Sequence, residues 1–70
     1  MLRYTIIIEK AGDNYSAYAP DLPGCITTGP TVEQTRRNME EAIAFHLHGM
    51  HEDGEPIPQP NSTAAIVEVA

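Results

Sequence analysis

The 70-residue sequence is poor in several features that define whole classes of protein. It has a single cysteine, so no disulfide can form within the chain. Four lysine and arginine residues face ten aspartates and glutamates, and the formal charge of −6 would repel a nucleic-acid backbone. The longest apolar run is far shorter than a membrane span, and no secretion signal opens the chain. We therefore expect a cytoplasmic protein that binds neither DNA nor membranes and whose charge suits a basic protein partner.

The sequence also lacks the motifs of nucleotide binding and nucleophilic catalysis. Cys25 has no lysine, arginine or histidine near it in sequence, which favours a packed side chain over a nucleophile. His46, His48 and His51 could share a metal ion only if the end of a helix unwound, because residues two apart on a helix diverge. We expect no enzymatic activity, no cofactor and no metal site.

The length indicates one small domain with limited stability of its own. A chain of this size buries only about 60% of the surface that its unfolded form exposes. Apolar residues make up 41% of the chain and charged residues 20%, which is a normal globular balance. We expect the chain to fold and to associate with itself as a homodimer or tetramer.

The periodicity of apolar residues predicts three short strands over 2–10, 15–19 and 25–28. The first two form a hairpin around a turn-forming segment at 11–14. After a single helix, residues 64–69 return to a β pattern and predict a last strand. The expected architecture is α+β, in the order β-β-β-α-β, with the helix packed on one face of a three-stranded antiparallel sheet.

The corner between the second and third strands has a distinctive composition. Pro23 and Gly24 suit the two central positions of a type II turn, because only glycine accepts the positive φ of the second position. Leu22 is expected to anchor this corner in the core. Pro20 ends the preceding strand, and Asp21 is expected to cap the turn through its own backbone.

The helix has recognisable start and stop signals. Thr31 is the expected N-cap, with Gln34 completing a capping box. The predicted helix covers 32–48, and Gly49 is its expected left-handed stop. Phe45 lies outside the apolar stripe that faces the sheet, so this large ring is predicted to be exposed.

A proline-rich connector over 52–63 follows the helix and can be neither helix nor central strand. Pattern alone reveals no repeat and no second domain within 1–70.

The corner and the helix match one protein family in register. The matching residues are Pro20-Asp21-Leu22-Pro23-Gly24-Cys25, Thr28-Gly29-Pro30-Thr31 and the helical Glu33, Asn38, Glu41, Ala42 and Ile43. Over residues 4–60 the chain thereby resembles the HicB antitoxins. The resemblance implies a partial ribonuclease H-type fold without the carboxylate cluster of that enzyme. It also implies binding to HicA, a small basic toxin with a double-stranded-RNA-binding fold that cleaves messenger RNA.

Two departures from the family pattern affect what the resemblance implies. Pro30 stands where the family often has an acidic residue, and 33–35 read Glu-Gln-Thr where Glu-Glu-Ala is common. Many HicB proteins also carry a DNA-binding domain after the antitoxin domain, which this sequence does not contain. We therefore expect no direct binding to an operator.

The leading hypothesis is an antitoxin of a type II toxin-antitoxin pair that covers the active face of a HicA-like toxin. The alternative is a stand-alone HicB-like regulatory or ligand-binding adaptor without a cognate toxin. The candidate partner contacts are the apolar Phe45 and Ile57 and the acidic Glu33, Glu40, Glu41, Glu52, Asp53 and Glu55.

Overall fold

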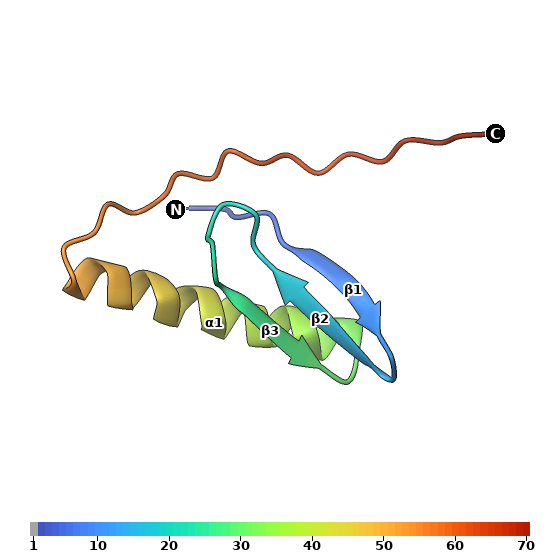
Figure 1. Cartoon of the computed structure of the whole chain (residues 1–70), viewed down its shortest axis with the longest axis horizontal. Helices are drawn as coiled ribbons and strands as arrows, with labels where there is room; N and C mark the ends of the chain where they lie inside the picture. The colour runs from blue at the N-terminus through green and yellow to red at the C-terminus, as the bar shows by residue number, and fades with distance from the viewer. Residues whose placement is uncertain (1) are drawn as a thin grey trace.

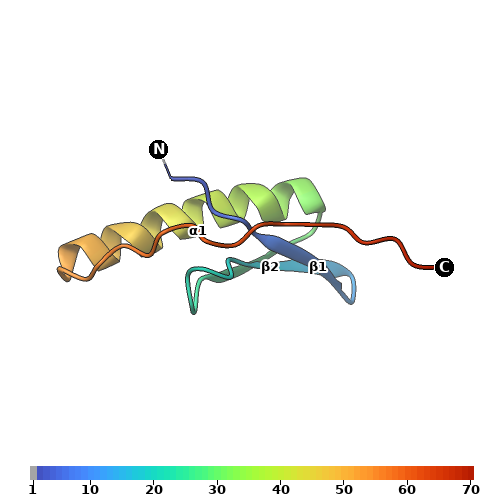
Figure 2. The same cartoon turned by 90° about the horizontal axis from the view of Figure 1, so that it is seen from above.

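The computed structural model describes residues 2–70, which form three strands and one helix in two layers. Strands β1 (Ile7–Ala11), β2 (Asn14–Tyr18) and β3 (Ile26–Gly29) make an antiparallel sheet in the order β1-β2-β3. Helix α1 (Val32–Glu52) lies across one face of this sheet (Figures 1 and 2). The α+β class, the three antiparallel strands and the helix on one face are confirmed.

The β1–β2 hairpin is closed by a two-residue loop. Ala11 pairs with Asn14, so Gly12 and Asp13 are the central residues of the turn. Gly12 has a φ of 64°, and no residue other than glycine has a positive φ among the described residues. A positive φ at the first central position alone is typical of a type II′ turn, whose twist matches that of the paired strands.

The corner after β2 folds as the sequence predicts. The backbone amide of Cys25 donates to the carbonyl of Leu22 across 3.1 Å, which closes a turn with Pro23 and Gly24 at its centre. Gly24 has a φ of 82°, as a type II turn requires. Leu22 is 1% exposed and lies beside the buried Met39 of the helix. The predicted anchor role of Leu22 is therefore confirmed.

Small side chains allow the helix to approach the sheet closely. Ala17 and Ala19 are buried at the interface between the two layers. A Cβ atom added to Gly29 would lie 2.6 Å from Oγ1 and 2.9 Å from the backbone nitrogen of Thr35. Thr35 is fully buried, and its hydroxyl donates to the carbonyl of Thr31 over 2.6 Å. The start of the helix is thus seated directly on the end of β3.

The helix begins as predicted, although its first turn is built differently. Thr31 accepts a hydrogen bond from the backbone amide of Gln34 at 3.0 Å, which confirms the cap. The Gln34 side chain, however, donates to Asn38 rather than returning to Thr31. The capping box is therefore incomplete, because the Gln34 side chain is directed to Asn38, one turn ahead on the helix.

The predicted end of the helix is wrong. The helix continues through Gly49 to Glu52, with Asp53 as its C-cap, and Gly54 with a φ of 71° is the left-handed residue. A glycine inside a helix costs only about 1 kcal/mol. The next turn, including the half-buried Met50, outweighs that cost, and Gly54 offers the same stop five residues later.

The predicted last strand does not form. Residues 64–69 are extended but pair with no strand in the part of the chain that the structure describes. The first strand is also shorter than predicted, because the corner at Pro20 turns the chain away from residues 2–6. A β pattern describes which residues suit a strand, but a ladder also requires a neighbouring edge in the right place.

Candidate partner-binding groove

An open groove lies between the second half of α1 and the start of β3. Its lining residues are Gly24, Cys25, Ile26, Ala42, Phe45, His46, Gly49, Met50, Asp53 and Glu55. Two large apolar side chains at the groove face solvent: Phe45 is 80% exposed and Ile26 is 64% exposed. Exposed apolar groups gathered beside a groove are typical of a site that binds another molecule.

Small residues account for the hollow shape. Gly24 and Gly49 have no side chain, and a Cβ added to either would meet no atom within 4 Å apart from its chain neighbours and, for Gly49, the backbone of its own helix. Ala42, one turn before Phe45 on the helix, adds only a methyl group to the lining. The groove therefore exists because glycine and alanine occupy positions where larger side chains would fill it.

One end of the groove carries a concentration of negative charge. Asp53 and Glu55 line it, and Glu52 is the last residue of α1, whose C-terminal end is the negative end of the helix dipole. The only nearby ion pair found in residues 2–70 joins His48 Nε2 to Glu52 at 3.8 Å, and it requires a protonated histidine. Carboxylates at the negative end of a helix repel each other, so a cationic partner would stabilise this region.

Some of the predicted contact residues gather at the groove. Phe45, Asp53 and Glu55 line it. Glu41 and Glu52 lie four residues before and seven after Phe45, a spacing that places all three on one helical face. Ile26 and Met50 also line the groove but were not predicted, because a strand residue and a residue beyond the predicted helix end give no sign in the sequence that they meet.

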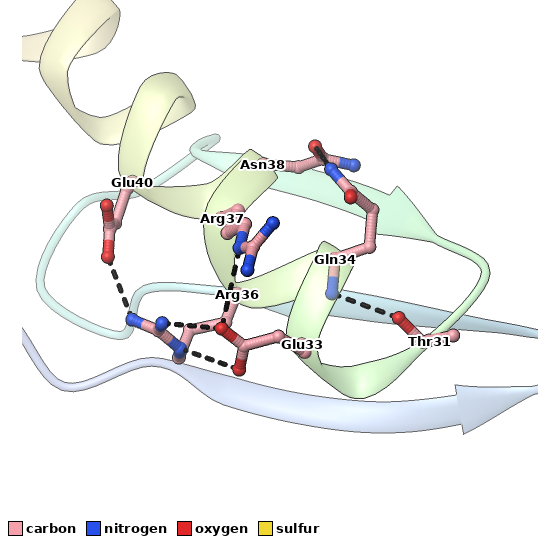
Figure 3. A network of polar contacts seen from close by, with 7 residues as sticks. All are labelled: Thr31, Glu33, Gln34, Arg36, Arg37, Asn38 and Glu40. Carbon is pink, nitrogen blue, oxygen red and sulfur yellow. Dashed lines mark hydrogen bonds and ion pairs between the residues drawn. The ribbon is translucent and has the colours of Figure 1, made fainter.

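Two predicted charges lie elsewhere and are already paired. Glu33 and Glu40 bind the same guanidinium, that of Arg36, at 2.7 and 2.8 Å (Figure 3). Arg37 adds a contact of 3.5 Å to Glu33. The hydrogen bonds and the charge of Arg36 lower the pKa of Glu33 below its ordinary value. These carboxylates are less available to a basic partner than those at the other end of the helix.

Ile57, the other predicted anchor, belongs to a different region. It is half-buried in the segment 57–62, which we call the strap and which crosses the molecule after the helix. The hydroxyl of Tyr4 donates to the carbonyl of Pro58, and the hydroxyl of Thr5 donates to the carbonyl of Ser62. Ile57 therefore does not line the groove.

Asp21 holds the strap in place. Its carboxylate accepts hydrogen bonds from the backbone amides of Asn61 and Ser62, each at 3.0 Å, and from the Ser62 hydroxyl at 2.9 Å. These bonds, chiefly that from the Ser62 amide, lower the pKa of Asp21. The predicted cap of Asp21 on its own backbone is wrong, because a pair of amides forty residues away offers it more donors.

Cys25 lies at the bottom of the groove and is only 4% exposed. Burial raises the pKa of its thiol, which opposes formation of a reactive thiolate. Within residues 2–70 no three histidine, cysteine or acidic side chains are grouped closely enough to hold a metal ion. Nor is any helix in that range long and apolar enough to cross a membrane.

A second hollow lies on the other side of the helix. It has a volume of about 470 Å³ and is bounded mainly by apolar side chains of the first residues and of α1. Its lining residues are Leu2, Tyr4, Ile6, Arg36, Met39, Glu40, Ile43, Ala44 and Leu47. Its size lies within the usual range of small-molecule sites.

These features define a small α+β domain that presents an acidic, partly apolar groove beside its single helix. A family model described as "HicB_like antitoxin of bacterial toxin-antitoxin system" matches residues 4–69. The chain belongs to this family of HicB-like antitoxins. The resemblance noted in the sequence is thereby confirmed.

Similar proteins occur in a phage, in bacteria and in archaea. An uncharacterised 14.9 kDa protein of Haemophilus phage HP1 is 47% identical over 83% of this chain, which spans only 44% of the phage protein. A UPF0150 protein of Thermoplasma acidophilum is 37% identical, and the match covers 94% of this chain and 97% of the relative. A solved structure titled "HicA3 and HicB3 toxin-antitoxin complex" contains a chain with 35% identity and a TM-score of 0.74. That match covers 86% of this chain and 70% of the other.

Proposed function

We propose that this protein is an antitoxin that binds a HicA-like toxin and prevents it from cleaving RNA. The observation that carries the proposal is the 35% identity to a chain of a HicA3–HicB3 complex over 86% of this chain. Membership of the HicB-like family supports the same role. The protein acts by binding and contributes no catalysis of its own.

The groove beside α1 is the proposed seat of the toxin. Phe45 supplies the apolar anchor that lasting inhibition needs, because binding energy concentrates in a few desolvated side chains. Asp53 and Glu55 line the same groove and give it negative charge. A toxin built to hold RNA phosphates is basic, so this charge accelerates encounter and selects the partner.

Co-expression with the neighbouring small basic reading frame tests the function. We expect that frame to arrest growth alone, and we expect this chain to restore growth and to co-purify with its product. If the neighbour is not toxic, or if its toxicity is unaffected by this chain, the antitoxin proposal fails.

Two helix variants test the location of the seat. Phe45→Ala should weaken toxin binding at least tenfold, since a buried aromatic anchor contributes 2 kcal/mol or more in typical interfaces. Val32→Ala is the matched control, because Val32 is also apolar and 50% exposed but lies at the opposite end of the helix. Equal effects of the two substitutions on the dissociation constant would exclude the groove as the seat.

The hollow of about 470 Å³ supports a second candidate function, that of a ligand-binding regulatory adaptor without a toxin. Its mainly apolar lining suits a small apolar molecule. Native mass spectrometry of the purified protein distinguishes the two functions. An adaptor would carry a small molecule that Ile43→Trp displaces, whereas an antitoxin needs no such ligand.

A further inference from the structure

Residues 64–69, which we call the arm, leave their apolar side chains in water. Ile66, Val67 and Val69 are 96%, 80% and 89% exposed. Their sequence is strongly β-forming, since branched aliphatic residues suit a pleated, half-buried surface. No backbone hydrogen bond joins the arm to any other part of the described chain. The arm is an extended segment that has the composition of a strand but pairs with no other part of the described chain.

The sheet has an unpaired edge, that of β1, on the same side of the molecule. β1 pairs with β2 along one edge only, so the N–H and C=O groups of its other edge are unpaired. An open edge of this kind is a template for another strand. The strap brings residue 62 beside Thr5, just before the start of β1. The vacant edge and the unpaired arm therefore lie on one side of the fold.

The arm nevertheless points away from its own sheet. Figures 1 and 2 show it diverging from β1 after the strap and extending beyond the hairpin. The hydrogen bonds from Asn61 and Ser62 to Asp21 hold the strap immediately before this departure. A strand that is fixed at its base and directed outward is placed to reach another molecule.

We propose that the arm pairs with the free edge of β1 in a second copy of this chain. Each copy offers one arm and one edge, so two copies can exchange arms reciprocally and close as a two-fold dimer. The gain is large for this domain, because its fully buried apolar core consists of Ala17, Ala19, Leu22, Cys25 and Met39. Burying two arms adds apolar contacts that one copy cannot make alone.

Charge and register support parallel pairing. A register that pairs Ile66 of one copy with Ile8 of the other keeps apolar side chains together, and a parallel ladder in this register places Glu68 next to Lys10. Ile8 already packs against the core, so Ile66 would extend that apolar surface. Lys10 and Glu68 are both exposed, and neither takes part in an ion pair within residues 2–70. Exchange would bring these opposite charges together.

The mass of the purified protein in solution is the first test. Light scattering coupled to size exclusion should report a dimer, and Ile66→Asp should convert it to a monomer that keeps the helical circular dichroism signal of α1. Folding of the single chain is not at risk, because Ile66 is 96% exposed in it. Gln59→Asp adds the same charge in the exposed part of the strap and should remain dimeric. A monomeric wild-type protein, or a dimeric Ile66→Asp variant, would overturn the proposal.

A disulfide test identifies which copy receives the arm. In a Cys25→Ala background, chains with Glu9→Cys and chains with Val67→Cys are co-expressed under different tags and oxidised. Arm exchange predicts a covalent heterodimer that disappears on reduction. A chain carrying both substitutions that cross-links only within itself would show the arm on its own β1. The absence of any cross-link would mean that the arm lies on no β1 edge, and either result contradicts the proposal. No toxin is needed for the expected result, so this test is independent of the proposed function.

Discussion

Two proline-rich connectors in this protein have opposite structural roles. The corner after β2 contains Pro20 and Pro23 and is part of the core, with Leu22 at 1% exposure. The strap after α1 contains Pro58 and Pro60 and lies on the surface. The corner makes its hydrogen bonds between residues three to six positions apart. The strap depends on side chains that are forty or more positions away.

The comparison shows what a proline does and does not determine. Proline fixes its own φ and removes a donor, which excludes helix and central strand in both connectors. Whether the segment then turns or stays extended depends on its neighbours. Gly24 accepts the positive φ that turns the corner. No strap residue has a positive φ, so the strap is extended, and hydrogen bonds to Asp21 hold it in that form. The corner is held by hydrogen bonds among its own residues, whereas the strap is held by hydrogen bonds to residues far away in sequence.

Leu22→Ala should break the corner and have the largest effect on stability. A fully buried leucine truncated to alanine costs about 2–5 kcal/mol in unfolding free energy. Urea denaturation followed by circular dichroism measures the loss. Ile57→Ala, in the half-buried strap, is the control and should cost clearly less. Equal losses would mean that the strap is as much a part of the core as the corner.

Gly29→Ala should rank next. The added methyl group would lie 2.6 Å from Oγ1 and 2.9 Å from the backbone nitrogen of Thr35, so the helix start must shift. Overpacking of this kind costs about 1–3 kcal/mol, measurable as a lower urea midpoint. Gly49→Ala is the matched control, since its added methyl group meets nothing and helix propensity improves by about 1 kcal/mol. A Gly29→Ala variant with an unchanged urea midpoint would contradict the close contact between the start of the helix and β3.

Thr31→Ala should have a smaller effect, confined to the helix start. It removes the hydroxyl that accepts from the Gln34 amide, and loss of an N-cap costs about 1 kcal/mol. The thermal midpoint should fall, and Thr31→Ser should retain most of the stability. Thr63→Ala, at an exposed position after the strap, should leave the midpoint unchanged.

Asp21→Ala should have the smallest effect on global stability, and its effect should be confined to the strap. It removes the acceptor of three hydrogen bonds, so the amides of Asn61 and Ser62 should exchange with deuterium faster. Urea denaturation should show little change. Asp13→Ala in the hairpin turn is the control and should leave the exchange at 61 and 62 unaltered.

The same contact predicts a pH dependence. The folded pKa of Asp21 lies below its ordinary value of 3.8, because its hydrogen bonds favour the ionised form. Protection of the strap is therefore complete above that value and is lost as the pH falls through the depressed pKa. Exchange at Asn61 and Ser62 should accelerate, beyond the intrinsic pH effect, in acid for the wild type. Asp21→Ala should show no such extra acceleration.

Local signals account for the parts of the fold that the sequence predicted. The turn at Pro23 and Gly24, the cap at Thr31 and the exposed Phe45 each depend on residues within one turn or one period. The end of the helix was predicted wrongly because Gly49 and Gly54 give the same local stop signal. Packing of the last turn, which the local sequence does not reveal, places the end before Gly54.

The candidate site was only partly predictable for a physical reason. The groove joins Ile26 of a strand to Met50 of a helix, and the strap joins Asp21 to Ser62. Neither contact leaves a periodic pattern in sequence. The sequence shows how many acidic residues there are but not which of them are free to bind a partner. The structure shows that Arg36 forms ion pairs with two of them.

The single thiol under the groove gives the protein a natural probe of its own motions. Cys25 is the only cysteine of the chain and is 4% exposed, so a thiol reagent can reach it only when the corner opens. The rate of alkylation therefore measures how often that opening occurs, with no engineered label. A molecule seated in the groove would also cover the route to this sulfur, so slower alkylation would report occupancy directly.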